Sequence, residues 1–114
     1  MIANINRQGH EAEPVKRYWL SFDLGLHGNY DALYEWLDRQ DAQECGDSVA
    51  TFRSNQPRDQ VAKEIKEILR GTKNARAYLI SMKEGGRFVV GKRKVSSWKG
   101  FAQVPADGGD RDEA

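Results

Sequence analysis

A carboxylate and an imidazole near the start of the chain are the first side chains that could do chemistry. The string YWLSFDLGLHG places Asp23 at the end of an apolar, strand-forming run and His27 four residues later, between glycines. One carboxylate is a weak site for a hard cation. Two Asp23 copies related by a two-fold axis could hold Mg²⁺ or Mn²⁺, with waters and phosphate oxygens as further ligands. His27 could then carry a proton or act as a second ligand.

The alternative for these two residues is structural. Asp23 would only end the strand and accept hydrogen bonds from the amides of the loop that follows. His27 would be an exposed loop residue with no role. Residue type and spacing leave both interpretations open.

Positive charge is concentrated in the second half of the chain, although the net charge is only +1. Residues 28–50 carry six carboxylates and one arginine, a balance of −5, and residues 51–99 carry thirteen lysines and arginines and four carboxylates, a balance of +9. Such segregation indicates an anionic partner for one face. The cations interleaved with Phe88 and Trp98 are the candidate nucleic-acid-binding residues: Arg87, Lys92, Arg93, Lys94 and Lys99. The alternative is a solubilising edge, because lysines protect exposed strands from aggregation.

The other reactive side chains match no catalytic pattern. Ser21 and Ser48 lie in no nucleophile elbow, and the sequence contains no phosphate-binding glycine loop. Cys45 has no neighbouring base and is expected to be a small buried apolar residue; a single cysteine also excludes an internal disulfide. The string KGFAQV (99–104) half-matches an RNA-recognition consensus, but it follows the last helix instead of forming the third strand.

Length and composition predict one domain with no membrane partner. The chain has 114 residues and a mean hydropathy of −0.77, and no apolar run approaches the roughly 18–20 residues needed to span a bilayer. The N-terminus lacks the pattern of a signal peptide, so a cytoplasmic location is expected. Residues 1–15 and the acidic, glycine-rich residues 105–114 are expected to be disordered, which leaves a domain over residues 16–104.

Periodicity and end signals predict four strands and two helices within that domain. Residues 17–24 alternate, with Tyr18, Leu20 and Phe22 on one face and Trp19 on the other. A helix begins after Asn29, which can cap it, and a second begins at Pro57 and stops at Gly71. The other predicted strands are 43–45 and 48–53, which form a hairpin, and 75–82.

This order predicts an α+β fold of the ferredoxin-like, split βαβ type, βαββαβ, with an additional C-terminal strand or hairpin. The string RFVVG after Gly85-Gly86 and residues 98–104 are the candidates for the addition. Both helices would cover one face of the sheet and leave the other open. That open face would expose Trp19, Tyr78, Ile80 and Met82, and exposed apolar patches usually mark interfaces. We therefore expect a homodimer, with an interface formed by Trp19, Ile80, Trp98 and Phe101.

The strings SFDL and DSVATF, the split βαβ order and the additional strand together resemble the small CRISPR-associated proteins of the adaptation machinery, over roughly residues 17–103. That family consists of ferredoxin-like homodimers, some metal-dependent nucleases and others non-catalytic bridging subunits. The resemblance implies that Asp23, which matches the aspartate ending the family's first strand, binds Mg²⁺ or Mn²⁺ and is catalytic. It also implies that residues 98–104 are exchanged across the dimer and that a protein partner completes an adaptation complex.

The chain departs from the family pattern at two points. Phe22 stands where the family usually has a tyrosine, and the arginines typical of the region between the two strings have no counterpart before Arg53. The implied function is a homodimeric, nucleic-acid-associated protein with metal-dependent endonuclease activity. The alternative is a non-catalytic dimerisation or regulatory module of the same fold, in a toxin–antitoxin or protein-interaction setting.

Overall fold

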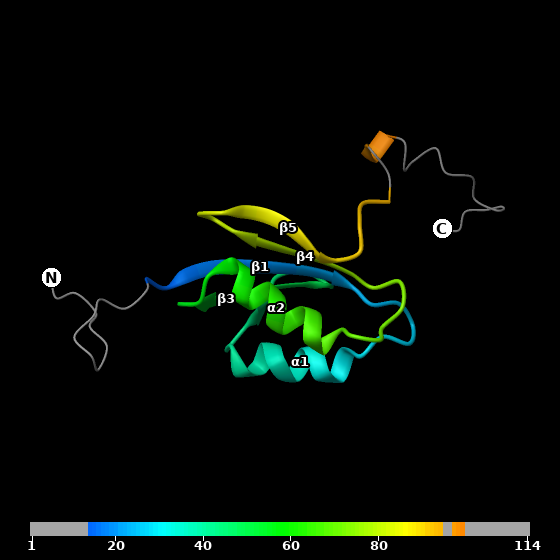
Figure 1. Cartoon of the computed structure of the whole chain (residues 1–114), viewed down its shortest axis with the longest axis horizontal. Coiled ribbons are helices and arrows are strands. Elements are labelled where there is room, and N and C mark those ends of the chain that lie inside the picture. The colour runs from blue at the N-terminus through cyan, green and yellow to red at the C-terminus, as the bar shows by residue number, and fades with distance from the viewer. Residues whose placement is uncertain (1–13, 95–96, 100–114) are drawn as a thin grey trace, which may run out of the picture.

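The computed structural model describes residues 14–94 and 97–99, and it folds them into a sheet with two helices on one side (Figure 1). The elements in chain order are β1 (Lys16–Asp23), α1 (Tyr30–Arg39), β2 (Gln43–Glu44), β3 (Val49–Ser54), α2 (Arg58–Ile68), β4 (Arg76–Ser81) and β5 (Gly85–Val90). The predicted α+β class and the predicted element order are confirmed. Of the two flanks predicted to be disordered, 1–15 and 105–114, the structure describes only residues 14 and 15.

The sheet is antiparallel throughout, in the order β2-β3-β1-β4-β5. β1 lies at its centre, where Trp19 stands opposite Thr51 of β3 and opposite Ile80 of β4. This arrangement is compatible with a ferredoxin-like fold. The strand β5 pairs with the outer edge of β4, so the order of the five strands differs from that of the four-stranded ferredoxin-like unit. β5 is the additional C-terminal strand that the sequence predicts.

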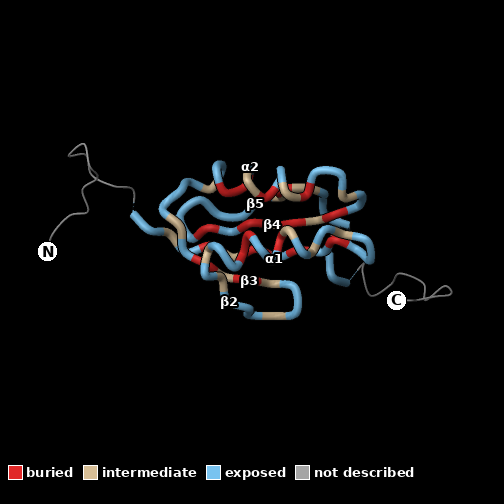
Figure 2. The backbone as a smooth tube through the Cα atoms, turned by 90° about the horizontal axis from the view of Figure 1, so that it is seen from below, coloured by how far each residue is buried: buried red, intermediate tan, exposed pale blue. Residues whose placement is uncertain are grey.

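The core lies between the helices and the sheet, and Figure 2 shows buried stretches along both helices and along the strands behind them. The prediction that Tyr18, Leu20 and Phe22 turn toward the helices is confirmed, because all three are buried. They pack against one side of each helix: Leu33, Trp36 and Leu37 of α1 and Val61, Ala62 and Ile65 of α2. Among the described elements, neither helix lies on the opposite side of the sheet.

The local end signals act as predicted, with small shifts. The Asn29 side chain accepts a hydrogen bond from the Ala32 amide (3.4 Å) and so caps α1. Pro57 is the N-cap of α2 instead of its first residue. The prediction that Cys45 is buried is wrong: β2 ends at Glu44, and Cys45 lies exposed in the turn that follows.

The chain leaves the sheet after β5. Gly91 has φ +81°, and a Cβ at this position would lie 2.6 Å from the Ala75 carbonyl oxygen, so the turn requires glycine. The strand that was predicted over residues 98–104 does not begin at Trp98, because the backbone of Trp98 and Lys99 is helical. The rest of that strand, including Phe101, lies outside the described residues.

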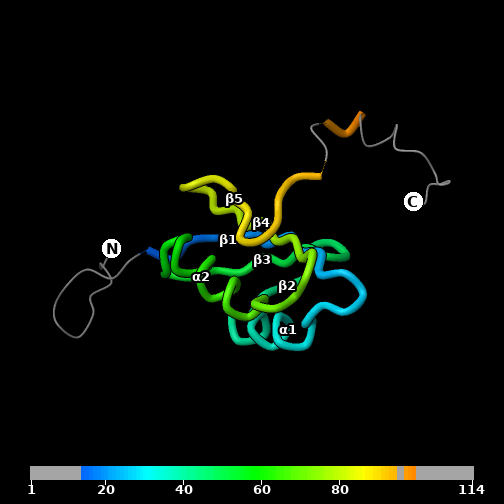
Figure 3. The backbone as a smooth tube through the Cα atoms, turned by 45° about the vertical axis from the view of Figure 1, so that its right-hand side comes forward, coloured from blue at the N-terminus to red at the C-terminus, as the bar shows by residue number. Residues whose placement is uncertain are grey.

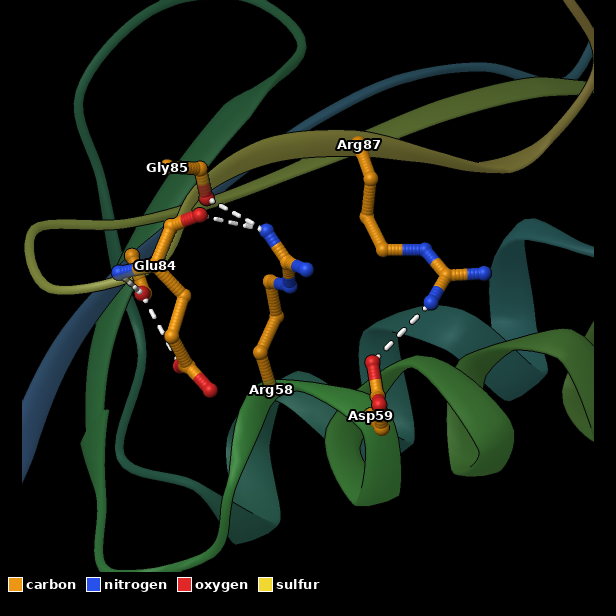
Figure 4. Close-up of polar contacts among 6 residues, drawn as sticks. Arg58, Asp59, Glu84, Gly85 and Arg87 are labelled. Atoms are coloured by element: carbon orange, nitrogen blue, oxygen red, sulfur yellow. Dashed lines mark hydrogen bonds and ion pairs between the residues drawn. The ribbon is translucent and has the colours of Figure 1, made fainter.

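The β4–β5 hairpin is fastened to the first turn of α2 (Figure 4). Arg58 donates from Nη1 to the carbonyl oxygens of Glu84 (2.7 Å) and Gly85 (3.2 Å). Arg87 of β5 donates to the Asp59 carboxylate at 2.9 Å. These contacts fix the edge strand β5 against the helix layer, and Arg87 with it.

Tyr18 gives the fold a dependence on alkaline pH. Its hydroxyl donates to the Gln56 carbonyl oxygen (2.5 Å), and burial, followed by the nearby Glu84 charge, raises its pKa above the usual value of 10, while Arg58 opposes the shift. The unfolded chain therefore loses this proton at lower pH than the folded protein. The stabilisation is complete below about pH 10 and is lost as the pH rises through the folded pKa.

We expect Tyr18→Phe to lower the free energy of unfolding at pH 7 by about 1 kcal/mol, because the Gln56 carbonyl loses its donor. The variant should lose less stability than the wild type between pH 9 and pH 11, because it lacks the group that titrates. Urea denaturation at the two pH values measures both quantities. An equal alkaline loss in the two proteins would show that Tyr18 does not govern it.

Candidate functional site

The open face of the sheet is the side opposite the helices. It is formed by the outward-facing residues of four strands: Arg17, Trp19, Ser21 and Asp23 of β1, Thr51 and Arg53 of β3, Arg76, Tyr78 and Ile80 of β4, and Phe88 of β5. The prediction that apolar side chains lie here is confirmed. Ile80 is 36% exposed and Met82, just past β4, is 80% exposed, while Trp19 and Tyr78 are half-buried.

Asp23 lies at one end of this face, as the last residue of β1. Its Oδ1 accepts a hydrogen bond from the Gly25 amide (3.2 Å), a contact that the structural alternative predicts. Its Oδ2 lies 4.0 Å from Nη2 of Arg76, the residue opposite it in β4. With 57% of its side chain exposed, the carboxylate can still accept further ligands from solvent.

A hollow of about 270 Å³ adjoins Asp23 on the open face. Tyr78 and Phe88 form its aromatic wall, with their rings edge to face and 4.9 Å between centroids. Gly86 is necessary for this wall, because a Cβ there would lie 2.5 Å from the Tyr78 ring. The other lining residues include Ser21, Asp23, Arg76 and Trp98. The hollow therefore combines one carboxylate, one guanidinium and aromatic surface, a set suited to an anion beside an apolar group.

One protomer does not supply a metal site here. Among residues 14–94 and 97–99, no three His, Cys, Asp or Glu side chains gather in a group that could hold a metal ion. His27 lies exposed in the loop between β1 and α1. The neighbour that the structure gives Asp23 is the cationic Arg76, which competes with a metal ion for the same carboxylate. A divalent cation at Asp23 therefore needs ligands that the described residues of one protomer do not provide.

The candidate nucleic-acid-binding residues divide into two groups. The basic segment, Lys92, Arg93 and Lys94, is exposed directly after Gly91 and departs on the side of the sheet away from the helices (Figures 1 and 3). Lys99 is also exposed. Arg87 lies on the helix side instead, paired with Asp59 (Figure 4).

Sequence reasoning missed Arg76. Arg76 lies beside Asp23. It also lies where the basic segment begins, because a Cβ on Gly91 would lie 3.0 Å from the Arg76 Cα. The signal that could have found it is strand alternation, because Arg76 shares a face with Tyr78 and Ile80. Its position opposite Asp23 depends on the register of β1 and β4, which alternation alone does not give.

A metal titration tests Asp23 directly. If two copies of Asp23 share a cation, Mg²⁺ or Mn²⁺ should raise the melting temperature, by the equivalent of about 2.7 kcal/mol per site at one hundred times the dissociation constant. Asp23→Asn should abolish this gain and leave the oligomeric state unchanged. Differential scanning calorimetry with and without each metal measures the effect. The same metal response in wild type and variant would remove Asp23 from any metal site.

Comparison with protein-family models, with curated proteins and with solved structures finds no match to this chain. Within the described residues, no helix is both long enough and apolar enough to cross a bilayer.

Proposed function

We propose that the protein is a nucleic-acid-associated homodimer with a ferredoxin-like fold, organised like the small CRISPR adaptation subunits that its sequence resembles. The apolar centre of the open face, around Trp19 and Ile80, is the dimer interface, and the basic segment at the edge of that face contacts backbone phosphates. One observation carries the proposal: neither α1 nor α2 covers one face of the sheet, and on that face apolar side chains occupy the centre and cations lie where the chain leaves β5.

The centre of the open face suits a second copy of the chain. Trp19 and Ile80 stand directly opposite each other on the two central strands, with Tyr78 and Phe88 beside them. A strand spacing of about 4.8 Å and a rise of about 3.3 Å per residue give a face of roughly 20–25 Å in each direction. Pairing two such faces over their full extent would bury about 1,000 Å² in total, the lower limit for a specific interface, so an interface confined to the apolar centre is small.

The basic segment suits a phosphate backbone. Lys92, Arg93 and Lys94 are exposed, and within the described part of the chain none of them forms an ion pair with a carboxylate. They leave the sheet on its open side, so a dimer formed there brings two basic segments to one assembly (Figure 3). Release of counterions from the nucleic acid then provides the favourable free energy.

The non-catalytic form of this proposal is favoured by the geometry at Asp23. Arg76 already supplies a positive charge 4.0 Å from the carboxylate, and within the described chain Asp23 belongs to no group of three or more His, Cys, Asp or Glu side chains that could hold a metal ion. Endonuclease activity with Mg²⁺ or Mn²⁺ is the catalytic form, and it requires a two-fold axis that brings two Asp23 side chains to one cation.

Two measurements test the proposed function together. Sedimentation at micromolar concentration should give a dimer, and fluorescence anisotropy at low salt should show binding of a labelled 20-base-pair duplex. A monomer that binds no nucleic acid would overturn the proposal. Cleavage of the bound duplex in Mg²⁺ or Mn²⁺, absent in Asp23→Asn, would establish the catalytic form.

A further inference from the structure

Two arginines stand directly opposite each other at the end of the open face far from Asp23. Arg17 of β1 and Arg53 of β3 are partners in the antiparallel register, and both are exposed. Like charges directly opposite each other in a sheet destabilise it. Within the described residues, neither arginine has a carboxylate within ion-pair distance. The fold therefore carries an uncompensated pair of cations at this position.

Hydrogen bonds hold one of these side chains in place. Arg17 donates from Nη1 to the Thr51 hydroxyl (3.1 Å), and that hydroxyl donates to the Tyr18 carbonyl oxygen (2.9 Å). This bond directs the guanidinium toward β3, the strand that also carries Arg53. A guanidinium held by one of its five N–H groups still offers several donors to a ligand.

A polar hollow of about 510 Å³ lies beside the pair. Both arginines line it, and so do the side-chain amides of Gln40 and Gln43, which can donate further hydrogen bonds. Asp41 is the one carboxylate among its lining residues, and it forms no ion pair with either arginine. The hollow is therefore rich in donors and carries net positive charge.

We propose that Arg17 and Arg53 form a phosphate-binding site, which rests on the proposed function and adds to it a second contact with the nucleic acid. Guanidinium groups on two directly opposed residues can both donate to the acceptor oxygens of one phosphate, and the bound anion would cancel the repulsion between them. Arg17 is six residues from Asp23, so the site lies about 20 Å along β1 from the end that bears the basic segment.

The first test uses inorganic phosphate and the melting temperature. The variant is the double substitution Arg17→Gln with Arg53→Gln, and the control is Arg39→Gln with Arg70→Gln, which removes two exposed arginines from the helix layer. Phosphate should raise the melting temperature of the wild type and the control, but not that of the variant. Without phosphate, the variant should melt about 1–5 °C higher than the wild type, because the repulsion is gone. An equal phosphate response in all three proteins would overturn the site.

The second test distinguishes a backbone phosphate from a free one. Binding of the 20-base-pair duplex, measured from 50 to 300 mM salt, should lose about 2 units of slope in log K against log salt in the variant, because two phosphate contacts disappear. The control should keep the wild-type slope. A phosphate-dependent rise in melting temperature without a change in slope would assign the site to a free phosphate or nucleotide instead of the backbone.

These outcomes separate this inference from the proposed function. Duplex binding that depends on the basic segment, but not on Arg17 and Arg53, would leave the function standing and refute the second site. No duplex binding at all, with a phosphate response that requires both arginines, would refute the function and leave an anion site. A wild type that responds to neither duplex nor phosphate would refute both.

Discussion

Trp19→Glu is expected to convert the dimer into a monomer at micromolar concentration. Trp19 lies on the central strand, opposite Ile80, so the substitution places a carboxylate in the middle of the proposed interface. Burial of an unpaired charge costs several kcal/mol, and about 4 kcal/mol raises the dissociation constant roughly 1,000-fold. Sedimentation velocity over a range of concentrations measures the change, and far-UV circular dichroism verifies that the variant folds.

Leu26→Glu is the matched control for this experiment. Leu26 is 95% exposed in the loop between β1 and α1, outside the sheet, so the same change of an apolar residue to a carboxylate should leave the dimer intact. Dissociation of both variants would indicate an effect of net charge instead of a contact at Trp19. A wild type that sediments as a monomer at all accessible concentrations would reject the interface itself.

Replacement of Lys92, Arg93 and Lys94 by alanine should flatten the salt dependence of nucleic-acid binding. Each phosphate contact contributes about −0.9 to the slope of log K against log salt on duplex DNA, so three contacts account for up to about 3 units per protomer. Between 50 and 200 mM salt, this corresponds to about a 40-fold change in affinity. The loss should be nearly the same for different sequences, because phosphate contacts position the protein and do not read bases.

A second triple variant controls for the loss of three charges. Lys63, Lys66 and Lys73 are exposed on α2 and in the loop after it, and their replacement by alanine changes the net charge equally. This variant should keep most of the wild-type slope. If the two triple variants behave alike, binding follows overall charge, and the basic segment is only a solvated edge. Anisotropy titrations at four or more salt concentrations give the slopes.

The sequence was sufficient wherever the signal is local. The cap at Asn29, the turn at Gly71 and the alternation around Tyr18 each depend on residues within one element, and all three features are present in the structure. The open face was predicted from the same alternation, because successive side chains of a strand point to opposite faces of the sheet. For this reason its apolar residues could be named in advance.

Long-range pairing could not be read in the same way. The juxtapositions of Asp23 with Arg76 and of Arg17 with Arg53 depend on strand registers between segments more than thirty residues apart. A shift of one residue would turn each of these side chains to the other face. The ion pair of Arg87 could not be predicted for a related reason: its partner Asp59 belongs to α2, and only the folded chain brings α2 near β5.

The central position of β1 has a consequence for how the molecule assembles. Two pairs of strands that are neighbours in sequence, β2 with β3 and β4 with β5, form local hairpins. β1 precedes both hairpins in the chain and pairs with one strand of each. Local hairpins close quickly, and pairing between distant segments is slower because more chain must be ordered. β1 is therefore the strand that unites two otherwise separate halves. A substitution that destabilises β1 therefore weakens the pairing of both hairpins at once. Within the sheet, a substitution in one hairpin affects the other hairpin only through β1.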